Sequence, residues 1–153
     1  MPKFAIERRV NHSAEQMFAL VSDIETYPQF LPMCEKLIIR GRSSEGGHEV
    51  IVADMTIAYA VIRETFTTRV TLDRPALVID VDYLDGPFHH LASKWTFVPT
   101  GEGKCLVRFA IDYEFKSRML TALMGGAFES VFRKFGEAFG ARADAIYGTP
   151  APA

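Results

Sequence analysis

The most informative segment for the fold is residues 117–147, SRMLTALMGGAFESVFRKFGEAFGARADAIY. Its apolar residues recur at steps of three and four, which is the period of one face of an α-helix. Ser117 is a candidate N-cap, and Gly148 and Pro150 mark the end of the pattern. A single helix over these residues would be on the order of 45 Å long. Its broad aromatic stripe needs a cover, which the rest of the chain must supply.

Seven upstream segments alternate between apolar and polar residues, which predicts β-strands that are buried on one face. They are residues 3–10, 35–42, 48–59, 62–72, 77–83, 88–98 and 105–115. The connections among the last six are short, so we expect an antiparallel meander.

Two short helices are predicted between the first and second strands. Ser13 and Gln16 form a capping-box pattern at the start of the first helix. Asp23 can cap a second helix, whose length Pro28 and Pro32 limit. The fold is therefore predicted to be α+β, with a strongly twisted seven-stranded antiparallel sheet wrapped around a long C-terminal helix. We expect a single domain over residues 1–148, followed by a disordered tail, residues 149–153.

Composition and charge exclude several classes of protein. The formal net charge of −2 argues against DNA or general nucleic-acid binding, which needs a cluster of basic side chains. No apolar run reaches the roughly 18 residues of a membrane span. Two cysteines, Cys34 and Cys105, are too few for a disulfide framework and lack metal-ligand spacing. The N-terminal residues do not read as a targeting signal, so we expect a cytoplasmic bacterial protein or a processed mature chain.

Some polar residues fall on the predicted apolar face of the sheet, namely Glu64, Thr68, His89 and Ser93. Either β-bulges carry them to the rim, or they line a pocket between the sheet and the helix. Both interpretations stay open at this point. Gly125 and Gly126 within the helix likewise allow two interpretations, close packing against the sheet or a flexible point that opens a pocket.

Catalytic motifs are weak in this sequence. It has no Gly-x-Ser-x-Gly motif and no glycine-rich phosphate loop. His89 and His90 are neighbours on a strand and point to opposite faces, so they do not form a metal site. Glu64 with His89 remains an open alternative as an acid–base pair, but a binding protein needs fewer assumptions than an enzyme.

The segment Val21-x-Asp23-Ile24-x-x-Tyr27-Pro28-x-Phe30-Leu31-Pro32-x-Cys34 resembles the coenzyme Q-binding START-domain family. That family includes the ribosome-association toxins and lies among the polyketide cyclase/dehydrase proteins. Further matches follow in the family's order, at Gly86-Pro87-Phe88, Leu91, Trp95-x-Phe97 and Phe115-x-Ser117. The family has the helix-grip fold, in which a sheet grips a C-terminal helix, as the periodicity independently suggests.

The resemblance implies a carrier or chaperone without a cofactor, not an enzyme. It would bind ubiquinone or a similar polyprenyl lipid and support respiratory electron transport and quinone biosynthesis. Its cavity would be lined by Tyr27, Phe30, Leu31, Glu64, Phe66, Thr68, Leu91, Ser93, Trp95, Phe109, Leu120, Leu123, Met124, Phe128, Val131 and Phe132. The quinone head would meet Glu64, Thr68 or Ser93, and the Tyr27–Pro32 corner would touch the inner membrane transiently, as a peripheral contact.

Two other functions compete with lipid carriage. One is a toxin-like protein that binds the large ribosomal subunit and blocks subunit joining. The other, less favoured, is a polyketide cyclase-like enzyme, which needs a polar cavity and an acid–base pair.

Overall fold

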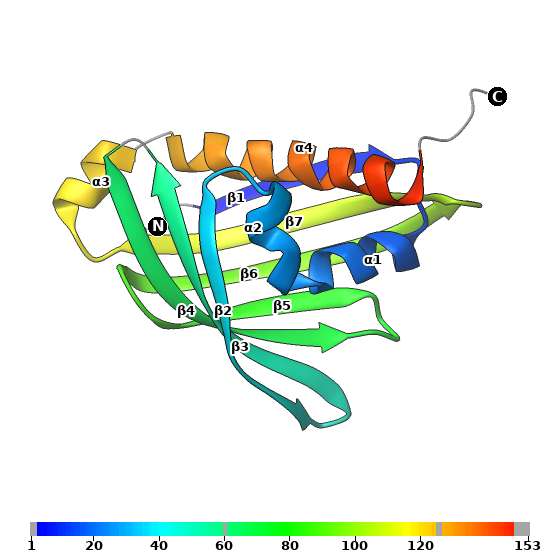
Figure 1. Ribbon diagram of the computed structural model, residues 1–153, viewed down its shortest axis with the longest axis horizontal. Helices are drawn as coiled ribbons and strands as arrows, with labels where there is room; N and C mark the ends of the chain where they lie inside the picture. Colours follow the sequence, from blue (N-terminus) through cyan, green and yellow to red (C-terminus); the bar gives the residue numbers. More distant parts are fainter. Residues whose placement is uncertain (1–2, 60, 125–126, 149–153) are drawn as a thin grey trace.

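A curved antiparallel sheet of seven strands forms the body of the molecule (Figure 1). The computed structural model describes residues 3–59, 61–124 and 127–148, except for the side chains of Met124, Ala127 and Phe128. The strands are β1 (Lys3–Val10), β2 (Cys34–Glu45), β3 (His48–Tyr59), β4 (Ile62–Asp73), β5 (Val78–Asp85), β6 (Phe88–Gly101) and β7 (Lys104–Phe115). Their order across the sheet is β1-β7-β6-β5-β4-β3-β2, which confirms the predicted meander from β2 to β7.

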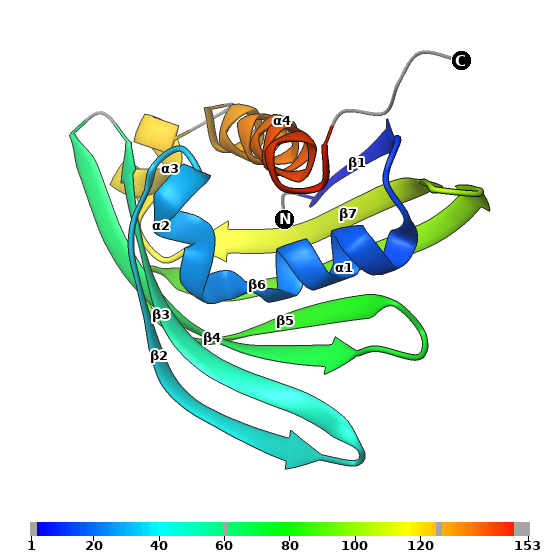
Figure 2. The same cartoon turned by 45° about the vertical axis from the view of Figure 1, so that its right-hand side comes forward.

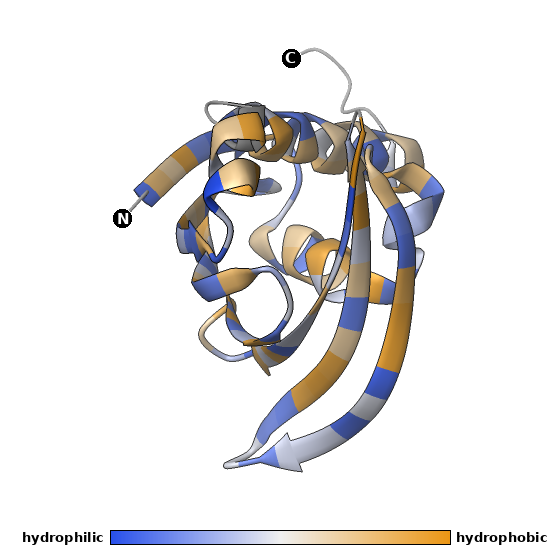
Figure 3. Cartoon of the chain, turned by 90° about the vertical axis from the view of Figure 1, so that its left-hand side faces the viewer, coloured by the Kyte–Doolittle hydropathy of each residue, from blue (hydrophilic) through white to orange (hydrophobic). Residues whose placement is uncertain are grey.

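Alternation along the strands separates an inner face from an outer one. On β7, Cys105, Val107 and Phe109 are buried, whereas the alternate residues Arg108 and Ala110 are exposed. Figure 3 shows the same alternation of apolar and polar residues along the long strands that face the viewer. The inner face packs on the helices, which is the arrangement that the sequence predicts for a half-buried sheet.

Two short helices follow β1, as predicted, with a turn of 3-10 helix between them. Helix α1 (Ala14–Ser22) begins in the capping box: Gln16 N donates to Ser13 Oγ at 3.0 Å, and Ser13 N donates to Gln16 Oε1 at 2.9 Å. The 3-10 turn η1 (Ile24–Thr26) leads into α2 (Tyr27–Phe30), with Pro28 in its first turn. Asp23 stands at the N-cap of η1, but its side chain makes no capping hydrogen bond there.

The C-terminal stretch forms two helices, α3 (Arg118–Met124) and α4 (Ala127–Tyr147), which corrects the prediction of one helix over residues 117–147. Ser117 Oγ accepts from Leu120 N at 3.2 Å, as a capping residue at the start of α3 does. The two helices point in different directions (Figures 1 and 2). Gly125 and Gly126, the predicted flexible point, and the predicted disordered tail lie outside the described residues.

The two helices diverge because they pack on different parts of the inner face. Leu120 of α3 belongs to a cluster around Phe88 and Tyr113 near one end of the sheet. Val131, Phe135 and Phe139 of α4 belong to the larger core. Each fully buried side chain of this size contributes roughly 1.5–3 kcal/mol, so neither helix can leave its own cluster without a large cost.

A β-bulge at the start of β6 overturns the expected position of His89. Phe88 pairs with Phe115 and His90 with Glu114, so His89 is the extra residue in the ladder. Its side chain is exposed, while Phe88 is 2% exposed. For His89 the bulge interpretation is therefore correct, because an inserted residue shifts the inward and outward alternation by one position.

Candidate functional site

An apolar cavity of about 120 Å³ lies between α4 and the inner face of the sheet. Helix α4 contributes Val131, Phe132, Phe135 and Phe139, one helical face in steps of three and four. The other walls come from η1, from α2 with the residue that follows it, and from β2 to β7. Their residues are Ile24, Tyr27, Leu31, Leu37, Ala53, Met55, Ile57, Phe66, Thr68, Val70, Ile79, Val81, Leu91, Ser93, Trp95, Phe109 and Ile111.

Aromatic rings form one continuous side of the cavity. The ring centroid of Trp95, the single tryptophan of the chain, lies 4.5 Å from that of Phe109 and 5.3 Å from that of Phe139. Phe109 in turn lies 5.1 Å from Phe132. Edge and tilted contacts of this kind contribute about 0.5–1.5 kcal/mol each beyond simple burial. The wall formed by β6, β7 and α4 is therefore held by mutual ring packing.

The polar groups of the cavity are few and uncharged. Thr68 is buried and Ser93 is half-buried, and both lie among apolar neighbours. The Tyr27 hydroxyl donates a hydrogen bond to the carbonyl oxygen of Val21 and so links α2 to α1. Burial of that hydroxyl raises the pKa of Tyr27 above its usual range, so it stays protonated at neutral pH. The cavity can thus offer hydroxyl groups to a ligand whose surface is otherwise apolar.

Many of the predicted cavity residues do line this space. They are Tyr27, Leu31, Phe66, Thr68, Leu91, Ser93, Trp95, Phe109, Val131 and Phe132. Phe30 does not line it and packs behind the wall, 5.4 Å from the ring of Phe139 and under the guanidinium of Arg142. Leu123 is 53% exposed on α3, because α3 turns its other face to the sheet. The side chains of Met124 and Phe128 lie outside the described residues.

Glu64 and Leu120 line a second, smaller cavity of about 30 Å³. Its other walls are Ile57, Tyr59, Ile62, Phe66, Pro87, Phe88 and Phe115. Ile57 and Phe66 face both cavities, so these two side chains separate the spaces. Glu64 is half-buried there and does not reach the main cavity.

The prediction missed the contributions of β3 and β5. Ala53, Met55 and Ile57 of β3, with Ile79 and Val81 of β5, all line the main cavity. Alternation along residues 77–83 already placed Ile79 and Val81 on one face. What the pattern lacked was a signal for which inward side chains leave a gap between them, since that depends on the curvature of the sheet.

The two cysteine side chains do not line the main cavity. Cys34 and Cys105 are buried free thiols, and burial raises the pKa of each to about 11, so both remain protonated at neutral pH. Within residues 3–59, 61–124 and 127–148, no three His, Cys, Asp or Glu side chains are grouped as metal ligands. None of the helices in that part of the chain is long and apolar enough to cross a bilayer.

Comparisons with known proteins point to one family. A family model described as polyketide cyclase/dehydrase and lipid transport matches residues 10–140. The ribosome association toxin RatA of Escherichia coli (strain K12) is 33% identical over 147 residues, covering 96% of this chain and 90% of that protein. The mitochondrial coenzyme Q-binding protein COQ10 of Drosophila melanogaster is 28% identical over 133 residues, covering 85% of this chain and 53% of that protein.

A solved structure agrees with these sequence matches. The solution structure of an 18 kDa protein from Caulobacter crescentus matches with a TM-score of 0.81 at 31% identity. The match covers 97% of this chain and 100% of that protein. The sheet and the C-terminal helices thus have a close counterpart.

Proposed function

The chain belongs to the polyketide cyclase/dehydrase and lipid-transport family, and we propose that it binds a polyprenyl quinone, ubiquinone or a close relative, as a carrier. The observation that carries this proposal is the cavity wall of aromatic and aliphatic side chains, broken by the hydroxyl groups of Thr68 and Ser93. A quinone ring has two carbonyl acceptors on an apolar body, which matches two hydroxyl donors in an apolar wall. The similarity to a coenzyme Q-binding protein supports the same ligand class.

The volume of the main cavity suits the ring of such a ligand but not its prenyl chain as well. Ligand pockets usually measure about 300–1,000 Å³, and a cavity of roughly 150 Å³ accepts a benzene ring. At about 120 Å³, the main cavity is on the scale of a single ring. We therefore place the quinone ring in it, and the prenyl chain must widen the gap between Ile57 and Phe66.

Binding accounts for this site better than catalysis does. The described wall contains no carboxylate, imidazole, thiol or amine, so general acid–base chemistry has no titratable group there except the Tyr27 phenol. Glu64 lines the smaller cavity and His89 is exposed at its bulge, so this pair does not supply one. A polyketide cyclase-like activity would need a polar site of a kind that this wall does not offer.

Trp95 provides a direct test of quinone binding. A quinone ring in the cavity would contact the single tryptophan and quench its fluorescence. We expect saturable quenching by a short-chain ubiquinone, and a quinone in the organic extract of natively purified protein. No quenching together with an extract free of isoprenoid quinones would contradict the proposal.

Thr68→Val tests the polar part of the same site. Replacing the hydroxyl with a methyl group keeps the shape and removes one hydrogen bond, worth about 1 kcal/mol, so binding should weaken about fivefold. Thr71→Val is the matched control, because Thr71 lies three residues further along β4 and faces the outer side. Equal quinone affinity in both variants would show that the Thr68 hydroxyl does not contribute to quinone binding.

Ribosome association is the second candidate, favoured by the nearly full-length similarity to RatA. The net charge of −2 weakens it, but a small basic surface suffices for a local contact with ribosomal RNA. Co-sedimentation with isolated large ribosomal subunits over a salt series separates the two functions. Binding that falls steeply with salt and is indifferent to quinone would favour this candidate over lipid carriage.

A further inference from the structure

Three large apolar side chains are exposed at one end of the molecule, around α3 and the β3–β4 turn. Val61 is 90% exposed, Met119 is 71% exposed and Leu123 is 53% exposed. We call these three residues the end patch. A single exposed apolar residue is ordinary, but a group of them in one region marks an interaction site.

The elements that carry the end patch are packed against the body of the protein. Met119 and Leu123 are four residues apart, so they share the outer face of α3. Leu120, on the other face, is 8% exposed and packs in a cluster with Tyr59 and Ile62, which flank the β3–β4 turn. Figures 1 and 2 both place α3 and that turn at the same end of the molecule. The exposed side chains are therefore presented by packed elements.

The segment that bears Met119 and Leu123 carries only positive charges, whereas Glu64 lines the small cavity beneath it. Residues 116–124 contain Lys116 and Arg118 and no acidic residue, and neither cation forms an ion pair with a described residue. Arg63, two residues after Val61, pairs with Glu35 at 2.9 Å. The nearest acids in the sequence, Glu114 and Glu129, stand on either side of the run. Apolar side chains flanked by unpaired cations complement a bilayer that contains anionic lipids.

The end patch also covers a route to the ligand site. Leu120, beneath it, lines the smaller cavity, and Ile57 and Phe66 divide that cavity from the main one. A lipid that leaves a membrane at α3 would therefore meet two consecutive spaces with largely apolar walls, the first of which also contains Glu64. This continuity distinguishes the end patch from other exposed apolar residues, such as Ile146 at the far end of α4.

We propose that the end patch docks on a phospholipid bilayer containing anionic lipid, with Val61, Met119 and Leu123 entering the interface and Lys116 and Arg118 facing the head groups. This inference rests on the proposed function, because docking would serve to exchange the bound lipid with the membrane. It moves the membrane contact from the predicted Tyr27–Pro32 corner to α3 and the β3–β4 turn.

The test is flotation of the purified full chain with vesicles of phosphatidylcholine, with and without phosphatidylglycerol. We expect binding to the mixed vesicles that Met119→Asp with Leu123→Asp reduces at least about tenfold, since each side chain loses its apolar burial. Arg118→Gln should reduce it about fivefold, as expected for one basic residue near an anionic surface. Ile146→Asp is the matched control and should bind as the unchanged protein does, because Ile146 is 50% exposed but distant from the end patch.

The outcomes separate this inference from the proposed function. Quinone binding, measured by Trp95 quenching in detergent, should be equal in the docking variants and the unchanged protein, because the end patch does not line the main cavity. Quinone binding without vesicle binding overturns the docking surface and leaves the proposed function standing. Vesicle binding without quinone binding supports the docking surface and contradicts the proposed function. Loss of ribosome co-sedimentation in the docking variants, with vesicle binding intact, would assign the end patch to the ribosome and overturn the inference.

Discussion

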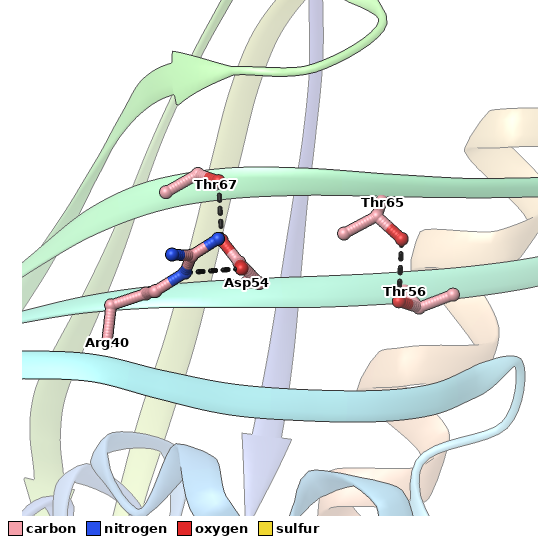
Figure 4. A network of polar contacts seen from close by, with 5 residues as sticks. All are labelled: Arg40, Asp54, Thr56, Thr65 and Thr67. Carbon is pink, nitrogen blue, oxygen red and sulfur yellow. Dashed lines mark hydrogen bonds and ion pairs between the residues drawn. The ribbon is translucent and has the colours of Figure 1, made fainter.

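Single residues on the outer face of the sheet hold three strands together where the sheet bends. Asp54 of β3 accepts hydrogen bonds from Arg40 of β2, at 2.6 Å, and from Thr67 of β4 (Figure 4). Arg40 lies at a register shift between Ile39 and Gly41, and Thr67 lies at another between β4 and β5. Irregular pairing weakens the ladder locally, so side-chain bonds across it take over part of the connection.

The pH dependence of stability should report the Asp54 network. The hydrogen bond from Thr67 and the Arg40 guanidinium lower the pKa of Asp54, so the carboxylate stabilises the fold above its unfolded pKa of about 4 and loses this effect as pH falls further. Asp54→Asn should therefore cost about 1–2 kcal/mol in free energy of unfolding at pH 7 and less at pH 3. Denaturant unfolding at both pH values measures the difference.

Asp82→Asn is the control for that experiment, because Asp82 is exposed on β5 and has no ion pair among the described residues. Its effect should be small at both pH values. An Asp54→Asn penalty that is the same at pH 3 as at pH 7 would mean that ionisation of Asp54 does not matter.

At the scale of elements, the β5–β6 turn depends on the absence of a side chain at Gly86. Its φ of +140° is one that other residues rarely adopt, and a Cβ there would lie 2.7 Å from the Cβ of Phe66. Backbone atoms of β4 are only slightly further from the same point, with the Phe66 Cα at 3.0 Å and the Thr65 carbonyl oxygen at 3.1 Å. The turn thus presses on β4 beside Phe66, a wall of both cavities.

Gly86→Ala should destabilise the protein by about 1–3 kcal/mol, because it adds backbone strain and a clash that only movement of β4 can relieve. Chemical denaturation measures the loss. Gly41→Ala is the matched control: Gly41 also lies in the sheet, but no atom beyond Gly41 and its two chain neighbours lies within 4 Å of its Cβ position. Equal stability of the two variants would show that the turn can rearrange freely.

For the molecule as a whole, the proposed ligand would be coupled to the fold through the gap between the sheet and α4. A ligand that binds only the folded state stabilises it by about 2.7 kcal/mol at a concentration of 100 times Kd. For a chain of this size that corresponds to a rise in Tm on the order of 5–10 °C. We expect short-chain ubiquinone to raise Tm in proportion to the logarithm of its concentration.

Ala53→Phe should abolish this rise in Tm, because Ala53 lies on β3 in the cavity wall and a phenyl ring would fill the space. Ala92→Phe places the same ring on the exposed outer face of β6 and should leave the quinone-dependent shift unchanged. Thermal scans of both variants with and without quinone compare them directly. A full shift in Ala53→Phe would place the ligand elsewhere.

Local patterns in the sequence determined most of the architecture. The alternation on β7, the capping box at Ser13 and the helical period of Val131, Phe135 and Phe139 are each set by neighbouring residues, so they can be recognised without the fold. The Tyr27-Pro28-x-Phe30-Leu31-Pro32 run pointed to the family, which the family model and the similarity to COQ10 confirm.

The remaining features depend on packing between segments that are distant in the sequence. The bulge that exposes His89, the separation of α3 from α4 and the exposure of Leu123 depend on which distant surfaces each segment packs against. The same holds for the cavity, because a gap of about 120 Å³ is what is left when a curved sheet and a helix fail to fill the space between them. A periodic pattern tells which side chains point inward, but the distance between opposing walls is set by the whole sheet.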